Sequence, residues 1–82
     1  MKNSYRLLAI ERTADSDPGC PAVIEKGEHE IIVVGSILTE EEESAMKKNA
    51  KVGVAPYERT VRIPRAVFEA AVDKLLTEKA EA

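Results

Sequence analysis

The sequence predicts an α+β fold with a small antiparallel sheet of three to four strands. A C-terminal helix packs on one face of this sheet, and a short helix lies near residues 40–48. Three observations lead to this prediction. Residues 31–38 form the longest β-branched run, residues 58–63 alternate between apolar and polar side chains, and residues 67–76 carry apolar side chains at helical spacing. We expect residues 1–82 to form one small domain.

The N-terminal segment predicts a strand followed by a loop. Residues 4–12 carry apolar side chains on both parities, which suits an edge or second strand; a helical turn over residues 7–10 is the alternative. Residues 13–21 are rich in Asp, Ser, Pro and Gly, which hydrogen-bond or restrict their own backbone. A loop is therefore expected there.

The centre of the chain predicts a hairpin whose second arm is the principal core strand. Residues 22–25 lead into a turn at residues 26–29, where Gly27 supplies a positive φ. The run 31–38 follows, and its Val and Ile content predicts a strand buried on both faces. Gly35 interrupts the run and marks either a bulge or a close approach of another backbone.

A capping signature opens the short helix. The Thr39 hydroxyl can accept the backbone N–H three residues on, and Glu42 stands where its carboxylate reaches back to the cap. The acidic first turn and the basic last turn match the helix dipole. Because few side chains here can be buried, we expect about two exposed turns.

The last third predicts a half-buried strand and a long amphipathic helix. Val61 and Ile63 face inward, Arg62 faces outward, and Pro64 ends the strand and opens the helix. The helix carries an apolar stripe made of Val67, Phe68, Ala71, Val72, Leu75 and Leu76. Truncation of a buried Phe68 to Ala should cost roughly 3–5 kcal/mol. Residues 78–82 are expected to fray.

Composition predicts a marginal core. Hydrophobic residues make up 44% of the chain, but only one Phe and two Tyr are aromatic. Near this length a lone core rarely supplies more than about 3–5 kcal/mol, so a homodimer that shares its core is expected. The N-terminus is too short and too charged for a signal peptide or membrane span, which predicts a cytoplasmic protein.

Charge is divided along the chain. The net charge is −3, and residues 13–48 hold nine acidic against three basic side chains. Phosphate binding usually needs a pronounced basic face, so the balance does not favour nucleic acid.

The chemical inventory does not favour an enzyme. Cys20 and His29 are the only thiol and the only imidazole, and catalysis normally needs three cooperating groups. A Cys–His pair is the catalytic alternative, and packing is the preferred interpretation. One His and one Cys do not complete a tetrahedral zinc site. Phosphate-cradling glycine patterns are absent as well. We therefore expect no catalytic residues, metal or cofactor.

One basic constellation is a candidate contact for an anionic partner. It consists of Lys51, Arg59, Arg62 and Arg65. Guanidinium groups at a strand-to-helix corner could hold phosphates or carboxylates in bidentate fashion. The alternative is a solvated strand face paired with the acidic middle of the same chain or of a twin.

A family resemblance rests on short structural motifs between residues 19 and 68. The motifs are Gly-Cys-Pro-Ala-Val at 19–23, Gly27, Ile-Val-Val-Gly at 32–35, Gly-Val-Ala-Pro-Tyr-Glu at 53–58 and Val-Arg-Ile-Pro at 61–64. Their order resembles small uncharacterised actinobacterial proteins commonly found beside helix-turn-helix regulators. The resemblance implies a regulatory accessory role and supplies no catalytic residue.

Two functional hypotheses follow. The first is a non-enzymatic interaction module, homodimeric, that acts through a protein partner such as a transcription regulator. The second is a small nucleic-acid-binding protein that uses the Arg and Lys residues named above. The helical stripe covers only one face of the core strand, so the other face, or an edge beside Gly35, is expected to meet a second subunit. The candidate subunit interface is Ile32, Val34 and Leu38.

Overall fold

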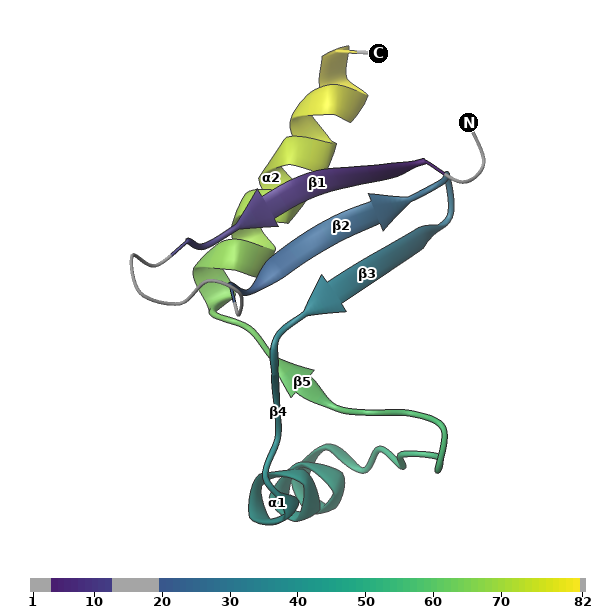
Figure 1. Ribbon diagram of the computed structural model, residues 1–82, viewed down its shortest axis with the longest axis vertical. Helices are drawn as coiled ribbons and strands as arrows, with labels where there is room; N and C mark the ends of the chain where they lie inside the picture. The colour runs from purple at the N-terminus through teal and green to yellow at the C-terminus, as the bar shows by residue number, and fades with distance from the viewer. Residues whose placement is uncertain (1–3, 13–19, 82) are drawn as a thin grey trace.

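The computed structural model describes residues 4–12 and 20–81 and shows an α+β arrangement (Figure 1). In chain order the elements are β1 (Tyr5–Ile10), β2 (Ala22–Lys26), β3 (Glu30–Val34), β4 (Ser36–Ile37), α1 (Glu40–Ala50), β5 (Val61–Arg62) and α2 (Arg65–Glu81). Strands β1, β2 and β3 form an antiparallel sheet in that order, and β4 pairs with β5 in a separate two-stranded sheet. The predicted fold class is confirmed.

The predicted hairpin is present. β2 and β3 pair antiparallel with Ile24 opposite Ile32, and Gly27 in the connecting turn has a φ of 62°. Segment 5–10 forms a strand beside β2, so the helical alternative for this segment is wrong. The loop expected at residues 13–21 lies mostly outside the described residues.

Strand β3 is not the core strand that its composition predicts. It lies at the edge of the sheet, and all five of its residues are exposed. The fractional exposures of Ile31, Ile32, Val33 and Val34 are 50%, 37%, 39% and 45%. The expectation of burial on both faces is wrong because β2 occupies the central position and α2 crosses behind β1 and β2 (Figure 1).

The core is small and lies between α2 and the first two strands. Its buried members are Leu8, Val23, Val67 and Ala71, with Ala9, Ile63 and Leu75 packed around them. The register of β1 against β2 shifts between Leu7 and Ala9, which marks a β-bulge at Leu8. The extra residue gives β1 two neighbouring side chains, Leu8 and Ala9, for the contact with the helix.

Helix α2 begins after Pro64, as predicted, but only half of its apolar stripe is covered. Val67 and Ala71 are buried, whereas Phe68 and Leu76 are 56% and 59% exposed. The expected burial of Phe68 is therefore wrong. One helix resting on a flat sheet covers the column of residues that faces the strands, and the adjacent column stays in solvent.

An ion-pair network ties the far end of α2 to the sheet. Arg6 on β1 donates hydrogen bonds to Glu25 on β2 and to Glu78 on α2, each with an N–O distance of 2.8 Å. The helix continues to Glu81. Residues 78–81, where fraying was expected, therefore belong to the helix in this structure, and Ala82 lies outside the described residues.

A second lobe, made of β4, α1, β5 and the segment between α1 and β5, projects from the sheet (Figure 1). The predicted capping box is present: Glu42 N–H donates to the Thr39 hydroxyl at 3.1 Å, and Thr39 N–H donates to the Glu42 carboxylate at 2.9 Å. No residue of α1 is buried, as expected for an exposed helix. The strand predicted at 58–63 is reduced to the two residues of β5. The radius of gyration is 14.7 Å, against about 12 Å for a compact chain of this length.

Gly35 stands at the junction of the two lobes. A Cβ at this position would overlap the carbonyl oxygen of Arg62 and would lie 2.7 Å from the Ile63 side chain. The close backbone approach predicted as one role of Gly35 is confirmed. This contact lets the chain pass from β3 into β4 beside β5.

Candidate interaction surfaces

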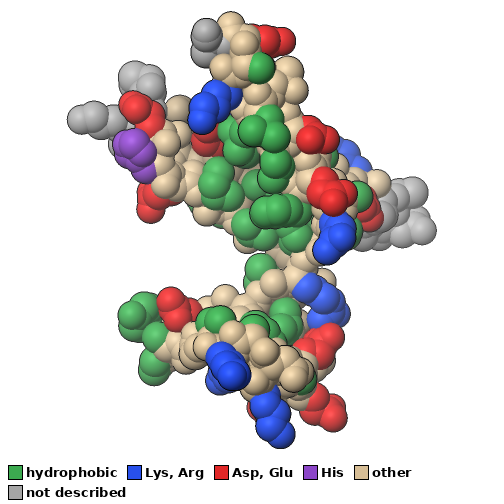
Figure 2. Space-filling model, turned by 180° about the vertical axis from the view of Figure 1, so that it is seen from behind, with side chains coloured by type: hydrophobic (Ala, Val, Ile, Leu, Met, Phe, Trp, Pro, Cys, Tyr) green, Lys and Arg blue, Asp and Glu red, His purple; other side chains and the backbone are tan. Residues whose placement is uncertain are grey.

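The first candidate interaction site is an apolar surface on the helix side of the sheet. Val33 pairs with Val23 and Ile31 with Glu25, so both β3 side chains share the sheet face on which α2 lies. Figure 2 shows hydrophobic side chains gathered over α2 and the sheet beside it. We call this the α2–β3 surface; it consists of Ile31, Val33, Phe68, Val72 and Leu76, each 36–59% exposed.

The opposite face of the sheet is also apolar. Ile32 pairs with Ile24, which in turn pairs with Leu7, so these three side chains line up across the strands. Leu7, Ile32 and Val34 are 44%, 37% and 45% exposed. Within the described part of the chain both helices lie elsewhere, because α2 packs on the other face and α1 belongs to the second lobe.

The predicted subunit interface is only partly brought together. Ile32 and Val34 share the far face of β3. Leu38 does not join them, because it follows β4 and its N–H donates to the Thr60 carbonyl in the second lobe. The grouping fails at Gly35, where the chain leaves the three-stranded sheet.

The exposed area is large for one chain of this mass. The accessible surface is 6792 Å², whereas a compact monomer of 9.0 kDa exposes about 4,900 Å². A standard interface takes about 800 Å² from each partner. Part of this difference comes from the projecting second lobe, in which no residue of α1 is buried.

The residues of the predicted basic constellation come from different segments, and two of them are engaged by groups of the same chain. Arg62 donates to Glu42 of α1 at 2.8 Å, and Arg59 donates to the carbonyls of Pro56 and Glu58 at 3.0 and 2.8 Å. Lys51 ends α1 in a left-handed conformation. Arg65 is the first residue of α2. The pairing of Arg62 with the acidic segment of the same chain agrees with the structural alternative for these residues.

The acidic end of α1 is held in its charged form. The hydrogen bond from the Thr39 backbone, aided by Arg62, lowers the pKa of Glu42. A hydrogen bond from the Thr60 hydroxyl, 2.7 Å from the carboxylate, is the main cause that lowers the pKa of Glu43. These contacts fix α1 against the segment that leads into β5.

Cys20 and His29 do not form a catalytic pair. Cys20 precedes the first residue of β2, and His29 is exposed in the turn beyond its last residue. The strand separates them. Across residues 4–12 and 20–81, His, Cys, Asp and Glu side chains form no group suited to a metal ion. In the same residues, neither helix is long and apolar enough to cross a membrane.

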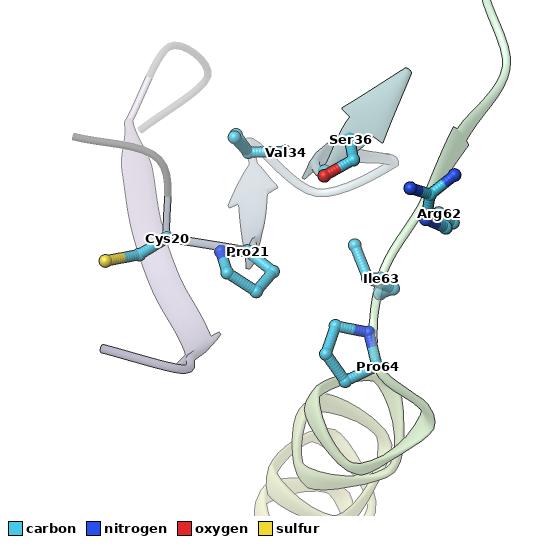
Figure 3. Close-up of a pocket in the computed structure, with 8 residues that line it drawn as sticks. Cys20, Pro21, Val34, Ser36, Arg62, Ile63 and Pro64 are labelled. Atoms are coloured by element: carbon cyan, nitrogen blue, oxygen red, sulfur yellow. The ribbon is translucent and has the colours of Figure 1, made fainter. Parts of the chain in front are cut away.

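A pocket of 460 Å³ lies at the junction of the two lobes (Figure 3). Its lining is mostly apolar and comes from the start of β2, the end of β3 and the link between β5 and α2. The Cys20 sulfur points away from the other labelled side chains, and Arg62 at the rim is paired with Glu42. The pocket is therefore a hollow with few polar groups that could bind a ligand.

Comparison of the chain with protein-family models, with curated proteins and with solved structures gives no match.

Sequence reasoning did not identify the α2–β3 surface. A signal for it was present in the helix, whose apolar positions form two adjacent columns, 67, 71, 75 and 68, 72, 76. A helix that only covers a sheet needs a stripe about 100° wide. The second column is the part that the sheet leaves exposed.

Proposed function

We propose that the protein is a non-enzymatic interaction module that works as a homodimer and acts through a protein partner. The observation that carries this proposal is the apolar surface left open by a single chain. Both faces of β3 and one flank of α2 expose large aliphatic or aromatic side chains. Contiguous apolar patches of this kind mark interaction sites on soluble domains.

The two surfaces suit two different contacts. The open edge of β3 presents backbone groups as well as side chains, and a second copy is its proposed occupant. The column Phe68, Val72 and Leu76 on α2 is a helical ridge with spacing i, i+4, i+8, which fits an apolar groove of another protein. A transcription regulator is the partner class suggested by the family resemblance.

The nucleic-acid alternative has less support. A phosphate-binding surface needs free cationic side chains on one face, but Arg62 is engaged by Glu42 and Arg59 by backbone carbonyls. The net charge of −3 also opposes attraction to phosphate.

The experiment combines light scattering with affinity capture from a cell extract. The bait is the wild type, the double variant Phe68→Ser/Leu76→Ser, or the matched control Glu69→Ser/Lys79→Ser on the same helix. We expect a dimer, and a captured protein that is retained by the control and lost with the apolar variant. A strict monomer that captures no protein contradicts the proposal. Duplex DNA binding at low salt that Arg62→Ala abolishes would favour the alternative.

A further inference from the structure

The backbone geometry identifies which groups of β3 are open. The N–H of Gly27 donates to the Ser4 carbonyl and the Pro21 carbonyl accepts from Glu11, both at 3.0 Å, so these odd-numbered positions face β1. Backbone polar groups alternate along a strand, and Ala22, Ile24 and Lys26 therefore face β3.

The pairing register of β2 with β3 determines which backbone groups of β3 face β2. The even positions of β2 pair with Val34, Ile32 and Glu30. Ile31 and Val33 consequently direct their N–H and carbonyl groups away from β2, toward the open edge. Each edge position offers one donor and one acceptor.

The two edges of the sheet differ in how they are protected. The β1 edge carries the bulge at Leu8 and the charged Arg6, two devices that discourage strand addition. The β3 edge has neither: Ile31 to Val34 is an uninterrupted apolar run without proline or charge. Such an edge is a template for another strand.

We infer that β3 pairs antiparallel with β3 of a second copy, which joins the two sheets into one of six strands. This inference rests on the proposed homodimer and specifies its contact. The register that uses every open group places Ile31 opposite the partner's Val33 and Ile32 opposite the partner's Ile32. Ile31 and the partner's Val33, whose backbone groups both point outward, then form a hydrogen-bonded pair. The two-fold axis generates the equivalent pair of Val33 with the partner's Ile31.

A second copy fits this edge better than an unrelated segment because the pairing is self-complementary. β3 is apolar on both faces, so its partner strand must also be apolar on both faces, as β3 itself is. In the antiparallel register Glu30 lies opposite the partner's Val34, which keeps like charges apart.

The pairing also accounts for the exposed area. The two-fold axis is perpendicular to the sheet, so both α2 helices lie on the same face. The two α2–β3 surfaces become neighbours, with Ile31 and Val33 of both chains as the floor between the helices. The far-face side chains Ile32 and Val34 gain cross-strand neighbours at the same time. One contact therefore gives each of the four apolar β3 side chains, which a single chain leaves exposed, a cross-strand neighbour.

Disulfide trapping tests the register. Residues at a non-hydrogen-bonded antiparallel position have Cα atoms about 4.5 Å apart, which lies within the range of a disulfide. In a Cys20→Ser background, Ile32→Cys should give a covalent dimer under mild oxidation. The control Ile24→Cys, on the same face of the central strand, should give at least tenfold less.

A proline variant tests the same edge without a cross-link. Val33→Pro removes an outward N–H and spares the bonds to β2, so it should yield a monomer with an unchanged far-UV circular dichroism spectrum. If Val33→Pro unfolds, the disulfide result decides.

The outcomes separate this inference from the proposed function. A wild-type dimer that Ile32→Cys does not cross-link overturns the β3 pairing and leaves the homodimer in place. A wild-type monomer overturns both the β3 pairing and the homodimer. The same holds if the wild type is a monomer whose β3 edge binds the strand of another protein.

Discussion

The carbonyl oxygen of Arg62 fills the position that a Cβ on Gly35 would occupy. This contact joins the three-stranded sheet to the second lobe, because Gly35 lies between β3 and β4 while Arg62 belongs to β5. Because glycine has no side chain, the two backbone segments can approach this closely at position 35.

Gly35→Ala should therefore destabilise the protein by about 1–3 kcal/mol, the usual cost of forcing extra atoms into a filled site. Gly53→Ala is the matched control, since a Cβ there would meet nothing within 4 Å; its effect should stay within about 0.5 kcal/mol. Urea unfolding of both variants measures the difference. Equal stabilities would show that the junction tolerates a side chain.

Core and surface positions of α2 and β1 should respond differently to truncation. Leu8 is 7% exposed and Phe68 is 56% exposed. Leu8→Ala should cost about 2–5 kcal/mol, whereas Phe68→Ala should cost far less than the about 3–5 kcal/mol typical of a buried Phe. Thermal unfolding at protein concentrations low enough to give monomer tests this contrast. A larger loss for Phe68→Ala than for Leu8→Ala would contradict the described core.

The Arg6–Glu78 ion pair should make stability depend on pH. The hydrogen bond from Arg6 is the main cause that lowers the pKa of Glu78 from its ordinary value of 4.5. A carboxylate with a lowered pKa in the folded state stabilises it above the ordinary value, and this contribution disappears as pH falls through the lowered value. The Tm difference between wild type and Glu78→Gln should thus be full at pH 7 and shrink below about pH 4.5.

High salt should reduce the same difference, because the paired side chains are partly exposed. Glu69→Gln on the same helix serves as a control for loss of a carboxylate charge. A Tm difference between wild type and Glu78→Gln that stays constant from pH 7 to pH 3 would show that the Arg6–Glu78 ion pair contributes nothing to stability.

The capping box should decide how well α1 is ordered. No residue of α1 is buried, so its end contacts carry more of its stability than packing does. Thr39→Ala should cost about 1 kcal/mol and raise amide hydrogen exchange in the first turns of α1. Exchange in β2 should remain unchanged. Ser44→Ala, an exposed position in the same helix, is the control.

Local features were predictable from the sequence because neighbouring residues determine them. Gly27 in its turn, Thr39 with Glu42 at the helix start, and Pro64 before α2 each depend on side chains a few positions away. The role of Gly35 was also accessible, because a glycine within a β-branched run has few explanations.

The placement of β3 could not be obtained in this way. A run such as Ile31 to Val34 is apolar whether it is buried by its own chain or by another, and strand order is a long-range property. The sequence therefore predicted correctly that a strand begins near residue 30, but its continuation to residue 38 and its burial were predicted wrongly. The exposure of the second apolar column of α2 could not be predicted for the same reason. The width of an apolar stripe on a helix does not indicate which element covers each half of it.

Light scattering of the wild-type protein is the decisive measurement, because the proposed homodimer is what covers the open edge of β3. At micromolar concentration we expect a molar mass twice the 9.0 kDa of one chain. A mass that stays at one chain up to the highest soluble concentration, with the fold intact, would contradict the proposed homodimer.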